Sequence, residues 1–196
     1  MKKILALLFV LLPLCGGAQI LGPRHHLEAG AGVVLPKEVF YSIKNVSEPT
    51  GAVYAAYRYN LTDGLSIGAQ YSYVIPHGTQ YYSQKTDPNK EDFYREYKQQ
   101  FHTLNAVLEY RLGKSDTMST YVGGGIGVHY YYALGKRIVG YDNDMSSIFP
   151  GVNLSLSFEF FHHLRLSLGH YHDITYHFYP NNPVASYYNL SVGWSF

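Results

Sequence analysis

The chain has little of three things that most soluble domains contain, namely charge, cysteine and long hydrophobic runs. Asp, Glu, Lys and Arg make up 15% of its 196 residues, against roughly 25% in an average soluble domain. Its single cysteine, Cys15, excludes an internal disulfide framework. Beyond the first residues there is no apolar run of the roughly 20 residues that a transmembrane helix needs. The formal charge of +1 argues against nucleic acid as a partner.

Aromatic residues and glycine are abundant instead. The chain contains 21 Tyr, 10 Phe and 19 Gly, although it has only one Trp. Many aromatic residues, few charges and no continuous apolar segment are typical of a β-barrel in a membrane, because apolar residues then occupy every second position of each strand.

The N-terminus has the pattern of a secretory signal peptide. Lys2 and Lys3 precede an apolar segment over residues 4–14, which is too short to span a bilayer as a helix. Gly16 and Ala18 provide small residues for cleavage after Ala18. We therefore expect a signal peptide over residues 1–18 and one barrel domain over residues 19–196. In the alternative, a lipoprotein signal, Cys15 would be acylated, but the preceding Leu14 is bulkier than that pattern prefers.

Eight segments alternate apolar and polar residues with the period of two that characterises β-strands. The last ten residues show it clearly, since Leu190, Val192, Trp194 and Phe196 alternate with Asn189, Ser191, Gly193 and Ser195. The expected strands cover residues 27–35, 51–60, 65–75, 100–112, 119–133, 150–160, 164–174 and 187–196.

The connections between these segments are alternately long and short. The longest and most polar is 76–98, and 134–147 is another long one, whereas Asp63-Gly64 is the signature of a tight turn. This rhythm predicts an all-β, eight-stranded, antiparallel up-and-down transmembrane β-barrel with both termini on the short-turn, periplasmic side. A soluble lipocalin-like barrel is the alternative, and its apolar residues would face inward.

The polar faces of the eight segments would line the lumen of such a barrel. We expect a lumen charge network there, formed by three acids and three arginines: Glu28, Arg58, Glu109, Arg111, Glu159 and Arg165. Eight strands enclose an interior that side chains just fill, so these charges should pair and plug the lumen. A narrow pore is the alternative. Tyrosines near the strand ends of the outer face would form aromatic girdles.

The seventh segment breaks the pattern of the outer face. Its alternation places Leu164, Leu166 and Leu168 toward lipid, and the same parity places His170 and His172 there too. Ser186, near the start of the last segment, has the outward parity as well. We therefore expect His170, His172 and Ser186 to lie close together on the outside of the barrel. Polar side chains inside a membrane are costly, so each is a candidate functional residue.

With its eight-strand pattern and terminal Phe196, the chain resembles the small eight-stranded outer-membrane β-barrel proteins of the OmpX type. This resemblance implies residence in the outer membrane of a Gram-negative bacterium and recognition of the C-terminal strand by the barrel-assembly machinery. The segment Gly169-His170-Tyr171-His172-Asp173 is also similar to part of the outer-membrane lipid A 3-O-deacylases. Those enzymes carry His-x-Ser-Asn here and a Glu at the start of the last strand. His170 matches their His, but His172 replaces the Ser and Ser186 stands near the place of the Glu.

These observations predict a non-enzymatic, monomeric outer-membrane barrel with a filled lumen and four exposed surface loops. Such a protein would serve surface binding or envelope integrity, in contact with outer-membrane lipid and lipopolysaccharide, and without a cofactor. The alternatives are a deacylase-like hydrolase using His170, His172 and Ser186, and a narrow pore. His170 and His172 with His177 also suggest a weak metal site.

Overall fold

The structure, a computed structural model, describes residues 24–36, 46–47, 49–83, 93–137, 143–174 and 186–196. All of its regular elements are strands. They are β1 (His25–Pro36), β2 (Val46–Ser47), β3 (Thr50–Asn60), β4 (Leu65–Ser83), β5 (Phe93–Lys114), β6 (Met118–Arg137), β7 (Asn143–Phe160), β8 (Leu164–Asp173) and β9 (Tyr187–Ser195). No helix among these residues is long and apolar enough to cross a membrane.

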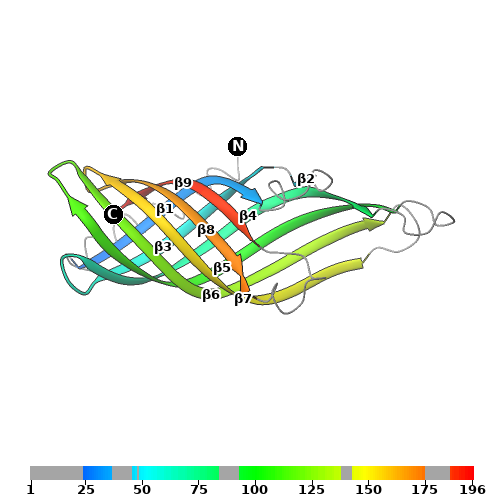
Figure 1. Cartoon of the computed structure of the whole chain (residues 1–196), viewed down its shortest axis with the longest axis horizontal. Coiled ribbons are helices and arrows are strands. Elements are labelled where there is room, and N and C mark those ends of the chain that lie inside the picture. Colours follow the sequence, from blue (N-terminus) through cyan, green and yellow to red (C-terminus); the bar gives the residue numbers. More distant parts are fainter. Residues whose placement is uncertain (1–23, 37–45, 48, 84–92, 138–142, 175–185) are drawn as a thin grey trace.

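The strands form one closed antiparallel barrel (Figure 1). Each long strand pairs with its neighbours in the sequence, and β1 pairs with β9 from Glu28↔Ser195 to Pro36↔Tyr187, which closes the wall. The short β2 pairs with β4 beyond the point where β3 begins. The predicted eight-stranded up-and-down barrel is therefore confirmed. Closure leaves no unpaired sheet edge in the wall, as a spanning β-structure requires.

At the end away from the short turns, the strands on one side of the barrel extend well beyond those on the other side. Pairing between β4 and β5 continues to Ser83↔Phe93, and β6 and β7 stay paired up to Gly135↔Asn143. In contrast, β8 ends at Asp173 and β9 begins at Tyr187. Figure 1 shows β5, β6 and β7 reaching far beyond the ends of β8 and β9. We call this extension of β4–β7 the raised side.

The expectation that 76–98 and 134–147 are plain connections was therefore wrong in part. Much of both segments continues the flanking strands. Pro76 suggested the end of a strand, but the structure accommodates it in a register shift between Val74 and His77. Strands beyond the barrel do not need an apolar outer face, so the alternation that marks the lower strands is missing there.

Compact local structures close the short-turn end. The hydroxyl of Thr62 accepts hydrogen bonds from the backbone N–H groups of Gly64 (3.3 Å) and Leu65 (3.1 Å), which fixes the predicted turn. Phe161 and His162, between β7 and β8, both have positive φ values, 52° and 63°. The C-terminal residue Phe196 lies at this end, where its N–H donates to the carbonyl of Leu27.

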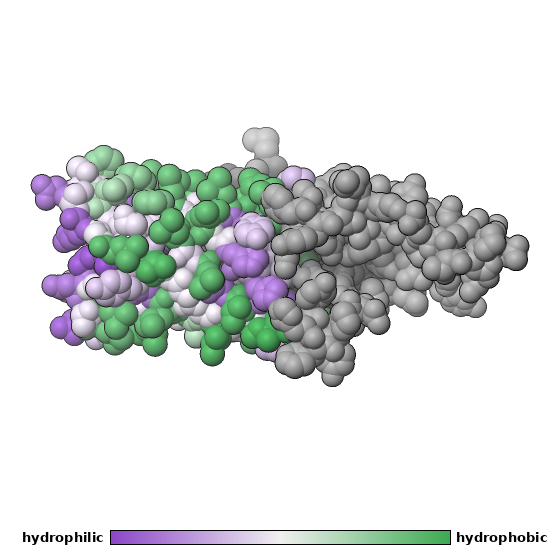
Figure 2. All heavy atoms as spheres, in the orientation of Figure 1, coloured by the Kyte–Doolittle hydropathy of each residue, from purple (hydrophilic) through white to green (hydrophobic). Residues whose placement is uncertain are grey.

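The barrel is apolar outside and polar inside. Figure 2 shows apolar residues over the visible face of the wall, which we call the apolar belt, and hydrophilic residues at the short-turn end on the left. Large apolar side chains are exposed on this belt, including Ile126 (69%), Leu154 (64%) and Leu190 (60%). The buried residues of the same strands are mostly Ser, Asn, Glu and Arg. This is the reverse of the lipocalin-like alternative, which is thereby contradicted.

Candidate functional sites inside and outside the barrel

Four charged residues from four different strands meet in the lumen. Arg58 of β3 lies between two carboxylates, with its Nη1 2.5 Å from Glu28 Oε2 and its Nε 2.7 Å from Glu109 Oε2. Arg165 of β8 approaches the same acids, at 2.7 Å from Glu109 Oε1 and 3.8 Å from Glu28 Oε2. The Tyr54 hydroxyl donates to the other Glu28 oxygen at 2.5 Å. We call Glu28, Arg58, Glu109 and Arg165 the charge cluster.

The charge cluster is neutral and almost wholly buried. Its four residues are between 2% and 7% exposed, so each charge depends on its partners rather than on water. The inward parity of the four strands turns these residues into the lumen, since Glu28 of β1, Glu109 of β5 and Arg165 of β8 all alternate with outward apolar neighbours. The stagger between the strands then brings them to one level.

Arg111 and Glu159 lie elsewhere. The four ion pairs that the structure describes all join Glu28 or Glu109 to Arg58 or Arg165. Arg111 and Glu159 instead line a polar vestibule of about 250 Å³ between the short turns and the charge cluster, whose four residues line its inner end. The structure thus brings four of the six expected network residues together and leaves two in the vestibule.

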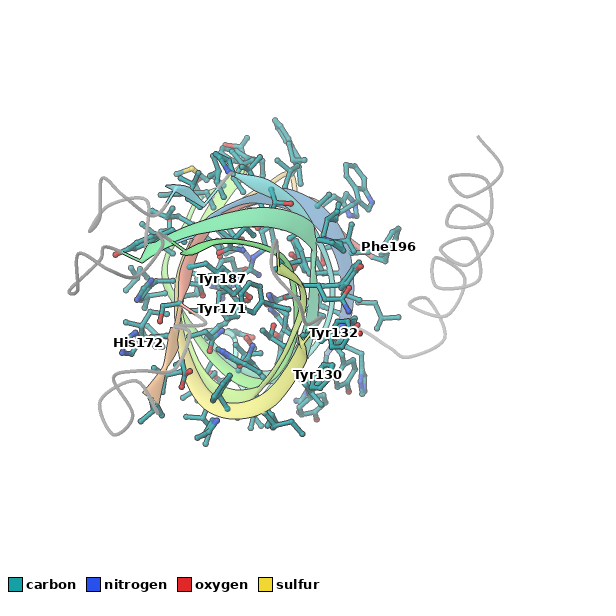
Figure 3. The ribbon with its side chains drawn as sticks, turned by 90° about the vertical axis from the view of Figure 1, so that its right-hand side faces the viewer. Tyr130, Tyr132, Tyr171, His172, Tyr187 and Phe196 are labelled. Atoms are coloured by element: carbon teal, nitrogen blue, oxygen red, sulfur yellow. The ribbon has the colours of Figure 1, made fainter. Side chains whose placement is uncertain are left out.

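Above the charge cluster, the lumen is closed by a second, apolar layer. Its residues are buried and come from six strands: Val34, Val74, Phe101, Phe149, Tyr171 and Tyr187. The rings of Tyr171 and Tyr187 stack at 4.7 Å, and Phe101 lies 5.9 Å from Tyr187. Figure 3 shows Tyr171 and Tyr187 pointing into the lumen. We call these six residues the apolar lid.

Little space remains between the two layers. Two voids in the described lumen measure about 20 and 10 Å³, which is enough for about one water molecule each. Gln70 crosses the interior to donate a hydrogen bond to the Tyr171 hydroxyl at 2.8 Å. The described part of the lumen is therefore closely packed between the charge cluster and the apolar lid.

The apolar lid did not emerge from the sequence, because strand alternation assigns inward positions to polar residues. A local signal existed: Val33-Val34 and Tyr73-Val74 are adjacent pairs in which both faces of the strand are apolar. Such pairs indicate a level at which the lumen itself is apolar.

The second candidate site lies on the outer wall, where β8 ends and β9 begins. The Ser186 hydroxyl lies 3.0 Å from Nδ1 of His172 and accepts a hydrogen bond from the Asp173 N–H at 3.3 Å. His170 stacks on Tyr188 at 4.4 Å and lies 5.9 Å from the His172 ring. Figure 3 shows His172 on the outside of the wall, and Figure 2 shows hydrophilic residues near the end of β8.

The structure therefore brings His170, His172 and Ser186 together where β8 ends and β9 begins, with the half-buried imidazoles outside and the Ser186 side chain buried (3% exposed). A serine hydroxyl beside an imidazole nitrogen has the geometry of a nucleophile and its base. A complete triad also needs an acid that orients the imidazole, and Asp173, the nearest acid in the sequence, belongs to the inward face and is 1% exposed. No group of three or more His, Cys, Asp or Glu within the described residues is arranged to hold a metal, and His177 lies outside those residues.

Comparisons with known proteins give the fold. No protein-family model and no characterised protein sequence matches the chain. The outer membrane protein OprG of Pseudomonas aeruginosa is similar in structure, with a TM-score of 0.55 and 13% identity over 88% of this chain and 95% of that one. A crystal structure of Ail, the attachment invasion locus protein of Yersinia pestis, in complex with the heparin analogue sucrose octasulfate, gives 0.53 and 13% over 88% and 97%. Neisserial surface protein A gives 0.50 and 14% over 88% and 96%.

Proposed function

We propose that this protein is a non-enzymatic outer-membrane barrel that acts as a solid anchor for a raised, surface-exposed sheet. The observation that supports the proposal is that the charge cluster and the apolar lid both cross the lumen, because an eight-stranded interior packed with side chains leaves little room for a solute or a substrate. The apolar belt provides the surface that a membrane requires.

The orientation follows from the two ends of the barrel. In bacterial outer-membrane barrels the short turns face the periplasm and the longer loops face outward. The short turns of this chain would then lie in the periplasm together with both termini, and the raised side with the four long connections would face the exterior. There it would bind surface ligands or support envelope integrity next to lipopolysaccharide. The strand ending at Phe196 would be read by the barrel-assembly machinery.

Trimming the raised side tests this proposal. In a variant with residues 78–98 replaced by Asn-Gly, His77 and Gln99, which are register partners, would be joined by a two-residue hairpin turn. We expect the variant to insert and to keep a heat-modifiable gel shift, because the charge cluster and the apolar lid lie below the cut. Trypsin added to intact cells should cleave the wild-type protein between Lys85 and Lys98, and the fragments that end in this segment should be missing from the digest of the trimmed variant.

Two results would contradict the proposal. Cleavage of the wild-type protein only after the cells are permeabilised would place the raised side in the periplasm. Failure of the trimmed variant to fold would show that the barrel needs the raised side for its own folding.

A second candidate function rests on the hydrogen bond between Ser186 and His172. As a nucleophile and its base, Ser186 and His172 would hydrolyse an acyl ester of lipid A, in keeping with the local resemblance to the lipid A deacylases. We then expect the purified protein to release fatty acid from lipid A in detergent micelles, and Ser186→Ala to lower the rate by about 10²-fold or more.

The matched control for this assay is Ser191→Ala, since Ser191 of β9 is as buried as Ser186 but lines the lumen. His170→Ala tests the stacked neighbour in the same way. If the wild-type protein releases no fatty acid, or if Ser186→Ala releases as much as the wild type, the hydrolase candidate is wrong.

A further inference from the structure

The vestibule is the mouth of the lumen at the short-turn end of the barrel. Each of the eight strands of the wall contributes at least one of its thirteen lining residues. All of these described residues are polar or charged, and none of them is aliphatic. The exposed side chain of His162, in the turn between β7 and β8, also lines the vestibule. The vestibule is therefore open to small polar solutes.

Two charges of opposite sign face the vestibule without being neutralised there. Arg111 of β5 and Glu159 of β7 take part in none of the four ion pairs that the structure describes. The register partner of Glu159 on β8 is Arg165, but the Arg165 guanidinium reaches Glu109 at 2.7 Å instead. Arg111 and Glu159 are both half-buried, so water compensates their charges only in part.

Strand register explains why Arg111 and Glu159 do not neutralise each other. The two residues belong to β5 and β7, with β6 between them. Arg111 is in register with Tyr121, whereas Glu159 is in register with Ser119, two residues away on β6. The Arg165 guanidinium lies 4.9 Å from the centroid of the Tyr121 ring, a cation–π contact that holds the ring in place. Tyr121 and Ser119 thus line the part of the vestibule between the two charges.

The inner wall of the vestibule also offers an unused donor. Arg165 is 2% exposed, and its Nε–H has no hydrogen-bond acceptor among the described residues. The ionic contact of this Nε with Oε2 of Glu28 is long, at 3.8 Å. A buried donor without an acceptor is costly, so an oxygen atom of a ligand bound in the vestibule would be stabilised here.

The vestibule as a whole is neutral when its imidazoles are neutral. Three arginines and three glutamates line it, and two of each belong to the charge cluster, where they pair with one another. What remains is one positive and one negative charge, on Arg111 and Glu159. An anion alone or an amine alone would compensate one of these charges and leave the other. A molecule that carries both signs would compensate both.

We propose that the vestibule binds a small zwitterion, with its carboxylate at Arg111 and its ammonium group at Glu159. The fork of an arginine binds a carboxylate through two parallel hydrogen bonds. The hydroxyls of Ser119 and Tyr121 are further partners between the two poles. The volume of about 250 Å³ is below the roughly 300–1,000 Å³ of pockets for drug-sized ligands, so the ligand is the size of an amino acid. This site is additional to the proposed anchor function.

An NMR titration tests the site in the folded protein. The isotope-labelled protein in detergent micelles is titrated with glycine, 4-aminobutyrate and 6-aminohexanoate, which differ in the distance between their charges. We expect at least one of them to give saturable shifts of the amide signals of Arg111, Tyr121 and Glu159, with no shift at Tyr187 of the apolar lid. Butyrate and butylamine, which carry one pole each, should bind about tenfold more weakly than the best zwitterion or worse, since each lacks one charge-assisted contact.

Substitutions at the two poles should act on different groups of the ligand. We expect Arg111→Ala and Glu159→Gln each to raise the Kd of the best zwitterion about tenfold or more. Arg111→Ala should leave the Kd of butylamine unchanged, and Glu159→Gln should leave that of butyrate unchanged, because the partner of each remains. The matched control is Lys114→Ala, which removes an exposed cation of β5 that is not among the residues lining the vestibule. It should change none of these constants.

Three results would overturn the zwitterion site. The first is the absence of saturable shifts with all three zwitterions, and the second is butyrate or butylamine binding as tightly as the best of them. The third is an unchanged Kd in both pole variants, which would place the ligand elsewhere. A heat-modifiable gel shift identifies a variant that does not fold, and the comparison of ligands on the wild-type protein decides without it. Because binding is measured in micelles, its failure would leave the proposed anchor function intact.

Discussion

Replacing Arg58 with alanine is expected to lower the free energy of unfolding by about 3–5 kcal/mol. Arg58 contacts both carboxylates of the charge cluster, and all four members are nearly inaccessible to water. Its removal would leave Arg165 alone between two buried acids. The loss can be measured by urea-induced unfolding in phospholipid vesicles, followed by Trp194 fluorescence.

Arg111→Ala is the matched control, because it removes the same side chain from the vestibule rather than from the cluster. We expect a loss below about 1 kcal/mol, since groups near water rely little on a particular partner. Equal losses for Arg58→Ala and Arg111→Ala would contradict the distinction between the charge cluster and the vestibule. They would show that the free energy of unfolding does not depend on which of the two arginines is removed.

The second large effect is expected on the outer wall. Ile126 lies near the middle of the apolar belt, between Ala106 of β5 and Val152 of β7, and is 69% exposed. If the belt faces hydrocarbon, Ile126→Arg should cost about 2–4 kcal/mol, the usual penalty for a cation at the bilayer midplane. The measurement is again urea-induced unfolding in vesicles.

Alternation along individual strands was enough to predict the barrel wall. In β7, Leu154 and Leu156 alternate with Asn153 and Ser157, and the structure exposes the first pair and buries the second. A barrel with lipid outside and polar side chains inside makes this pattern obligatory. The pairing of strands adjacent in the sequence then follows from the short turns.

Interactions across the lumen were less predictable. Parity indicated that Arg58 and Arg111 both face inward, but it does not give their heights along the barrel. Height depends on the stagger between strands, which places Arg58 against Glu28 and Glu109 and leaves Arg111 in the vestibule. The apolar lid escaped prediction for a related reason, since Phe101 and Tyr187 come together only after the barrel has closed.

The site where β8 ends and β9 begins shows how far local reasoning can reach. Parity predicted that His172 and Ser186 face the same side, and their strands are neighbours, so a contact was expected; the structure places Ser186 3.0 Å from His172. The identity of an orienting acid was beyond such reasoning, because it depends on tertiary placement. Asp173 illustrates the limit, since it is adjacent to His172 in the sequence and yet belongs to the opposite face.

The most direct test of the central claim, that the apolar belt is embedded in a membrane around a filled barrel, compares Ile126→Arg with Phe161→Arg in the same vesicles. Phe161 is 67% exposed, almost as much as Ile126, but it lies in a turn at the short-turn rim, where arginine costs only about 0–1 kcal/mol. We predict that Ile126→Arg is the more destabilising of the two by about 2 kcal/mol or more. Equal free energies of unfolding for the two variants would contradict the account.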